Sequence, residues 1–127
     1  MLIAAERSGE SIDDLVGDDD DVVIAAITAA ELLVGVEMAD AQHRQARSAL
    51  VEEVLAAVPV EDYDLEVARV HAWLLADGLR RGARGGAHDL IIAATAAARH
   101  REVVTADPAG FADLPGVPIR HARPPSS

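Results

Sequence analysis

Short apolar runs alternate along this chain with longer segments whose apolar residues recur at helical spacing. The short runs consist mainly of Val, Ile and Ala and predict buried strands, because a strand covered on both faces needs no polar alternation. Strands that alternate with helices predict parallel pairing and a doubly wound α/β arrangement. The predicted strands are residues 22–27, 58–60, 102–105 and 117–120.

The segments between these runs are predicted to be helices. Thr28 and Glu31 match a capping box, which predicts that a helix opens at Thr28 and continues to about residue 38. Asp64 is placed to cap an amphipathic helix, and Asp89 is placed to open a helix over 90–99 that is apolar nearly all round and therefore buried. Further helices are predicted at residues 2–7, 11–17 and 41–58, and a loop at 78–86.

Three carboxylates lie where the predicted strands end or the predicted helices begin: Glu31, Asp89 and Asp107. Each also has a purely structural interpretation: Glu31 completes the capping box, Asp89 caps a helix, and Asp107 begins a turn before Pro108. However, sites in parallel sheets form at the carboxyl ends of the strands, where these three side chains would converge. The residues around Glu31 are apolar on every face, which predicts a buried helix whose carboxylate needs a partner or a metal.

Clustered carboxylates repel one another unless a cation lies among them. An oxygen-only ligand set, in a chain without cysteine, suits Mg²⁺ or Mn²⁺, which typically serve phosphoryl chemistry. His88 adjoins Asp89 and is interpreted either as a surface histidine or as a hydrogen-bond donor behind the ligands. Arg80, Arg81 and Arg84 precede Asp89 and are candidates for holding the phosphates of a substrate; a solvated Arg-Gly loop is the alternative.

Composition limits the function classes. The 127 residues fit one domain, half of them are hydrophobic, and the net charge of −11 argues against a general nucleic-acid coat protein. One Trp, one Tyr and one Phe are too few for an aromatic platform that stacks bases. No export signal or bilayer-length apolar run is present, so we expect a cytoplasmic protein with no membrane partner. The sequence contains neither a P-loop nor a G-x-S-x-G elbow.

Three blocks of this sequence resemble PIN-domain proteins, in particular the VapC toxins of bacterial VapBC toxin–antitoxin pairs. They are residues 27–35 (ITAAELLVG), 88–96 (HDLIIAATA) and 103–111 (VVTADPAGF), in matching order and spacing. The resemblance implies one PIN domain over 1–127, a three-layer α/β/α fold with a central parallel sheet. It further implies an endoribonuclease toxin dependent on Mg²⁺ or Mn²⁺, a homodimer neutralised by a cognate VapB-like antitoxin whose basic tail enters the acidic cleft.

In this resemblance Glu31, Asp89 and Asp107 match the second, third and fourth acids of the family's cluster. The first acid belongs to an Asp-Thr/Ser-Ser-x-Leu-Ile block on the opening strand, and residues 1–3 match only the end of that block. We therefore expect the first strand and its aspartate to be absent, as if the start codon had been assigned too late and the domain truncated at its N-terminus. Two alternatives stay open: a catalytically impaired PIN-like binding module, and an unrelated α/β metal phosphohydrolase.

Overall fold

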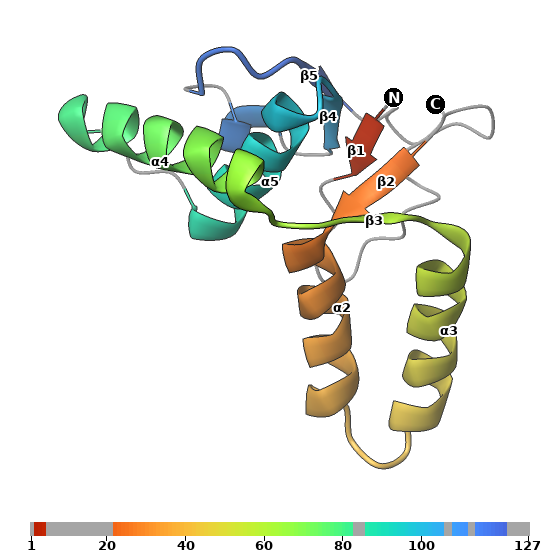
Figure 1. Cartoon of the computed structure of the whole chain (residues 1–127). Coiled ribbons are helices and arrows are strands. Elements are labelled where there is room, and N and C mark those ends of the chain that lie inside the picture. Colours follow the sequence, from red (N-terminus) through yellow and green to blue (C-terminus); the bar gives the residue numbers. More distant parts are fainter. Residues whose placement is uncertain (1, 5–21, 83–85, 106–107, 112–113, 122–127) are drawn as a thin grey trace, which may run out of the picture.

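A parallel sheet forms the centre of the molecule (Figure 1). The computed structural model describes residues 2–4, 22–82, 86–105, 108–111 and 114–121 of the 127. In this part of the chain, five strands pair in the order β3-β2-β1-β4-β5, every pair parallel. The strands are β1 (Leu2–Ala4), β2 (Val22–Ala25), β3 (Val60–Glu61), β4 (Glu102–Thr105) and β5 (Ile119–His121).

Two pairs of helices lie against this sheet. In Figure 1, α2 and α3 run side by side as a hairpin that extends away from the strands, and α4 and α5 form the second pair. The helices are α2 (Ala26–Met38), α3 (Arg44–Ala57), α4 (Leu65–Arg80), α5 (Ala87–Ala98) and the short 3₁₀ helix η1 (Pro108–Phe111). None of the described helices is both long and apolar enough to cross a membrane.

The side chains of the strands alternate between two cores. Val23 and Val103 point into a larger core with α4, α5 and η1, whereas Ile24 and Val104 point into a smaller one with α2 and α3. Both faces of the sheet are therefore covered, which explains the lack of polar alternation in the strand sequences. The predicted three-layer α/β/α arrangement with a parallel sheet is confirmed.

The central position of the sheet is occupied by β1, so the expectation of a missing central strand is wrong. Residues 2–4 of the helix predicted over 2–7 form this strand. Ile3 pairs with Val23 on one side and Val103 on the other and is fully buried. Without β1, the backbone groups of β2 and β4 would lack partners along two ladders. That long-range demand, with burial of Ile3, outweighs any local helical preference. β1 contains no carboxylate, so the family's first acid does not lie on it.

Two of the three predicted helix caps differ from the structure. β2 continues directly into α2, which begins at Ala26 without a side-chain cap, so Thr28 lies inside the helix and does not open it. The α5 helix begins at Ala87, with Gly86 as N-cap, and places Asp89 within its first turn. The third prediction is confirmed, because Asp64 caps α4 by accepting a 3.0 Å hydrogen bond from the amide of Val67.

The two apolar helices differ in burial. The α5 helix is largely buried, as predicted. The prediction of a buried α2 is wrong: Val34 is 57% and Met38 81% exposed. The cause is the projection of the α2–α3 hairpin beyond the sheet, which leaves one face of α2 without intramolecular cover.

The remaining boundaries agree with the predictions to within a few residues. The strand at 102–105 is confirmed, whereas α3 begins at Arg44, α4 extends to Arg80, and the last strand is shifted to Ile119–His121. The predicted helix at 11–17 lies outside the described residues.

Candidate active site

Two of the predicted carboxylates are carried by helices that contact each other, α2 and α5. Glu31 lies in α2 shortly after β2 ends, and Asp89 lies in the first turn of α5. His88 joins the two helices, because its Nδ1 atom lies 3.2 Å from Oε2 of Glu31. The prediction that Glu31 and Asp89 come from different elements to one region is therefore consistent with the structure. Asp107 lies outside the described residues.

The environments of the two carboxylates differ. Asp89 is buried, 9% exposed, and a Cβ atom placed on Gly86 would be 3.7 Å from its Oδ2 atom, so the carboxylate lies close to the N-cap of α5. The positive end of the helix dipole stabilises a negative charge at this position. The side chain of Glu31 is 35% exposed, which leaves it accessible to solvent ions.

These side chains fit a hard divalent cation by donor type, since both offer carboxylate oxygens. Within the described part of the chain, no three His, Asp or Glu side chains converge closely enough to hold an ion by themselves. A complete ligand set therefore needs donors beyond Glu31 and Asp89, such as water molecules or the predicted Asp107.

The predicted RNA-binding arginines lie at the end of α4. Arg80 is the last residue of this helix and is exposed. Arg81 follows as its C-cap and pairs with Asp77, with 2.9 Å between Nε and Oδ2. Arg84 lies outside the described residues. Gly82, the residue after Arg81, has a positive φ of +69°.

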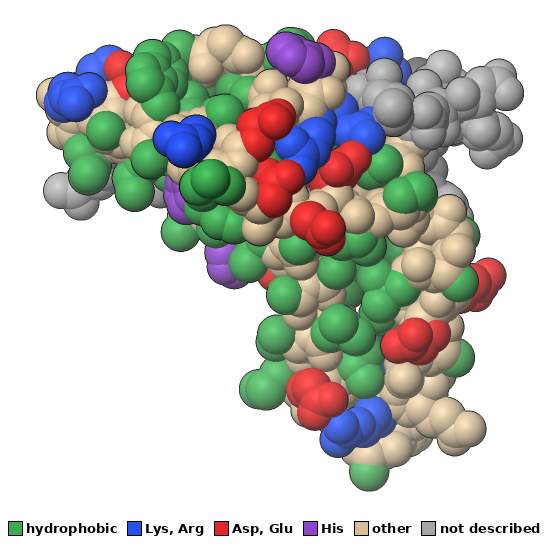
Figure 2. All heavy atoms as spheres, in the orientation of Figure 1, with side chains coloured by type: hydrophobic (Ala, Val, Ile, Leu, Met, Phe, Trp, Pro, Cys, Tyr) green, Lys and Arg blue, Asp and Glu red, His purple; other side chains and the backbone are tan. Residues whose placement is uncertain are grey.

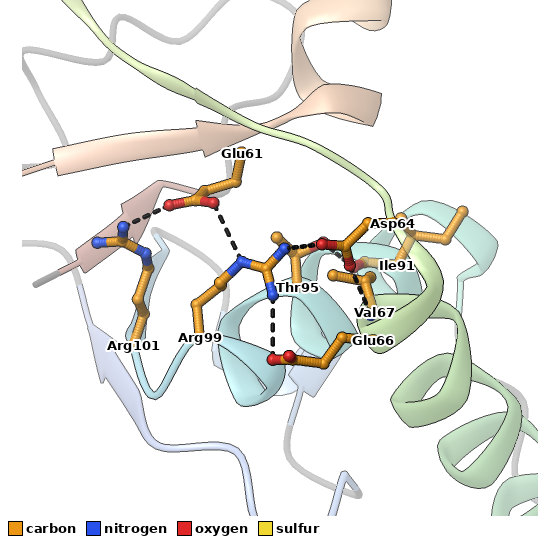
Figure 3. Close-up of polar contacts among 8 residues, drawn as sticks. All are labelled: Glu61, Asp64, Glu66, Val67, Ile91, Thr95, Arg99 and Arg101. Atoms are coloured by element: carbon orange, nitrogen blue, oxygen red, sulfur yellow. Dashed lines mark hydrogen bonds and ion pairs between the residues drawn. The ribbon is translucent and has the colours of Figure 1, made fainter.

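A cluster of two arginines and three carboxylates, absent from the sequence-based predictions, joins β3 and α4 to the end of α5 (Figure 3). Arg99 contacts three acids: its Nε atom lies 3.2 Å from Glu61, its Nη1 atom 3.1 Å from Glu66, and its Nη2 atom 2.5 Å from Asp64. Arg101, which is buried, donates to the other oxygen of Glu61. On the molecular surface these charges gather where β3 leads into α4 (Figure 2).

The cluster changes the pKa values of its members. Burial raises the pKa of Glu61, but hydrogen bonds from Arg101 and Arg99 and their positive charges outweigh it, and the pKa falls below its ordinary value. The pKa of Asp64 is lowered by the amide of Val67 and then by Arg99. The cluster lies at the opposite end of α5 from Asp89, about 15 Å along the helix axis. It therefore secures the fold and lies apart from the candidate site.

Comparison with known proteins gives one consistent family. The PIN-domain family model matches residues 2–117. The tRNA(fMet)-specific endonuclease VapC of Salmonella typhimurium is 34% identical over 96 residues, which cover 76% of this chain and 71% of that protein.

Solved structures agree. DNA-bound VapBC from Salmonella typhimurium contains a chain 32% identical, with a TM-score of 0.75 over 79% of this chain and 74% of that one. VapBC-5 of Mycobacterium tuberculosis, a member of the VapBC family of toxin–antitoxin systems, has a chain 35% identical, with a TM-score of 0.68 over 81% and 82%. The chain therefore belongs to the PIN-domain family, and within that family of nucleases to the VapC toxins.

Proposed function

We propose that this protein is an endoribonuclease toxin that hydrolyses RNA phosphodiester bonds with Mg²⁺ or Mn²⁺ held by Glu31, Asp89 and Asp107. The observation that carries the proposal is the contact between α2 and α5, which brings Glu31 close to the first turn of α5, where Asp89 lies. Membership of the PIN-domain family, whose members are nucleases, supports the proposal that this pair belongs to an acid cluster that acts on phosphodiester bonds.

The chain's own residues have distinct tasks in this mechanism. A bound divalent ion supplies an activated water and stabilises the negative charge that develops on the phosphate. Asp89 is held by the first turn of the buried helix α5, so it offers a rigid ligand. Glu31 is more exposed, which leaves its carboxylate accessible to an ion from solvent.

Substrate binding is proposed to involve Arg80, Arg81 and Arg84. Guanidinium groups bind phosphate oxygens through paired hydrogen bonds, and a chain of net charge −11 needs local cations to hold RNA. Arg80 and Arg81 are both exposed at the end of α4, and Arg81 pairs with Asp77 through its Nε atom. Because one relative is named a tRNA(fMet)-specific endonuclease, initiator tRNA is the first substrate to test.

The central experiment compares Glu31→Gln and Asp89→Asn with the matched control Glu53→Gln, an exposed acid on α3. Each change keeps side-chain size and removes one anionic ligand. We expect both site variants to lose Mn²⁺ affinity and RNA cleavage, with an unchanged circular dichroism spectrum, while the control behaves as the parent. Undiminished cleavage at limiting Mn²⁺ by folded site variants would contradict the assignment.

A second experiment tests the arginines. Changing Arg80, Arg81 and Arg84 together to Gln should weaken RNA binding and flatten its dependence on salt, because fewer counterions are released. Arg69→Gln, an exposed change within α4, serves as the control for a general loss of charge. An unchanged salt slope in the triple variant would show that these side chains do not contact phosphate.

We also propose a cognate VapB-like antitoxin as partner and a homodimeric, cytoplasmic toxin. The proposal is supported by apolar side chains exposed on α2 and α4, which a folded protein usually covers with a partner. Co-purification with the protein encoded beside this gene, and light scattering of each species, test the complex and the dimer. The large exposed apolar residues are Leu33, Val34 and Met38 on α2 and Leu65, Trp73, Leu75 and Leu79 on α4.

The second candidate function is a catalytically impaired binding module. It is favoured by the absence of a carboxylate from β1, where the family's first acid is expected. Binding of RNA and antitoxin without cleavage, at saturating Mn²⁺ or Mg²⁺, would support this alternative over the toxin nuclease.

A further inference from the structure

We propose that His88 is a positioning residue that holds Glu31 in the orientation needed to bind the divalent ion. This inference rests on the metal site of the proposed function. The Nδ1 atom of His88 lies 3.2 Å from Oε2 of Glu31, and the contact joins α5 to α2. One oxygen of the Glu31 carboxylate is therefore engaged by the imidazole, and the other is left to an ion.

The sequence position of His88 gives this contact its consequence. His88 and Asp89 are neighbours in the first turn of α5, and side chains of consecutive helical residues diverge by about 100°. The same helical turn thus carries one proposed ligand and the residue that contacts the other. Any shift of α2 relative to α5 changes the distance between the ligands and the geometry of the His88–Glu31 pair together.

Glu31 needs such a partner more than Asp89 does. Its side chain has three rotatable bonds and is 35% exposed, whereas Asp89 is shorter and buried against the start of its helix. Ordering a mobile glutamate reduces the affinity for an ion, and a polar neighbour whose contact restricts the carboxylate in advance restores part of that affinity. Among the described residues, the ion-pair contact of Glu31 is the one with His88.

The test is Mn²⁺ affinity in the absence of RNA, measured by titration calorimetry for three substitutions of His88. Asn places its amide nitrogen the same number of bonds from the backbone as Nδ1, Gln places it one bond further, and Ala removes the donor. We expect His88→Ala to weaken Mn²⁺ binding about tenfold. This is the smallest loss typical of residues that support a metal ligand, and we expect it because the His88–Glu31 pair is partly exposed. His88→Asn should bind within about twofold of the parent, and His88→Gln should lie between the two.

A matched control is available in a second histidine–carboxylate pair. His43 lies 2.7 Å from Asp40 between α2 and α3, and both side chains are exposed. His43→Ala removes the same chemical group and should leave Mn²⁺ affinity unchanged.

Two results would overturn the inference. Parent-like Mn²⁺ affinity in His88→Ala would show that the contact does not position Glu31. Equal losses in His88→Asn and His88→Ala would show that the imidazole itself is required, as a ligand of the ion.

The Glu31→Gln variant separates this inference from the proposed function. If Glu31→Gln loses affinity and His88→Ala does not, the metal site stands and the role of His88 is refuted. If Glu31→Gln binds Mn²⁺ as well as the parent, the proposed site fails and the role of His88 fails with it. If the metal site and the role of His88 are both correct, adding His88→Ala to Glu31→Gln should cause no further loss of Mn²⁺ affinity, because the histidine acts through the glutamate.

Discussion

Replacement of Ile3 by Ala tests whether residues 2–4 form the central strand. Ile3 is fully buried and lies between Val23 of β2 and Val103 of β4. The change removes three carbon atoms, worth about 2.4 kcal/mol at ~0.8 kcal/mol for each buried methylene. A cavity between two packed layers adds to this value, so we expect the free energy of unfolding to fall by about 3–4 kcal/mol, within the range measured for such changes.

Equilibrium urea unfolding, followed by circular dichroism, measures this loss. With a slope of about 1–3 kcal/mol/M for small proteins, the unfolding midpoint should fall by roughly 1–4 M. Val34→Ala, at an exposed site on α2, is the control and should change the free energy of unfolding by less than about 0.5 kcal/mol. If Ile3→Ala does not fold, the milder Ile3→Val should still lower it by about 0.5–1.5 kcal/mol. Equal midpoints for the parent, the Ile3 variants and Val34→Ala would refute the placement of β1.

Three further predictions concern single sites. Thr28 is fully buried and its hydroxyl has no hydrogen-bond partner among the described residues, so Thr28→Val should raise the free energy of unfolding by about 1 kcal/mol; a lower melting temperature would indicate a partner for the hydroxyl. The lowered pKa of Glu61 means that its ionised form stabilises the fold above its ordinary value of 4.5, and this stability is lost as the pH falls through the lowered pKa. Glu61→Gln should therefore flatten the acid limb of a plot of melting temperature against pH, and an unchanged limb would argue against the contribution of this group. Gly82 has φ of +69°, which is unfavourable for Ala, so Gly82→Ala should lower the free energy of unfolding in urea by about 1 kcal/mol. Gly35 lies inside α2, where a Cβ atom would make only ordinary contacts, so Gly35→Ala should raise the free energy of unfolding by about 0.5–1 kcal/mol. A change of the same sign for both variants would contradict the backbone argument.

Local signals predicted the elements whose formation depends on neighbouring residues. The strand at 102–105 is an apolar run with charged residues before it, and the cap at Asp64 needs only an amide three residues later. The capping signature at Thr28 and Glu31 failed because a sequence pattern does not show whether a strand leads into the helix without a break.

Features that depend on distant residues were harder to predict. The apolar residues of α2 indicated burial, but the hairpin extends beyond the sheet, and an apolar face awaiting a partner has the same composition as a buried one. The pairing of Arg99 with Glu61 links residues 38 positions apart, and no local spacing announces it. In the candidate site, the positions of Glu31 and Asp89 at predicted helix starts, and then the family blocks, made them candidates. The contact of His88 with Glu31, in contrast, depends on how α2 packs against α5.

The central place of β1 also determines when the protein can finish folding. β1 is synthesised before the other described strands, yet one of its two neighbours, β4, pairs with it across 100 positions, Leu2 with Glu102. At about 5–20 residues per second, the ribosome takes roughly 5–20 s to make that partner. The α2–α3 hairpin has its contacts close in sequence and can form during this interval, whereas the sheet cannot close. Glu31 and Asp89 both precede β4, so these two candidate ligands are synthesised before the sheet that positions them is complete. A nascent chain that ends before β4 therefore carries both carboxylates without the finished site.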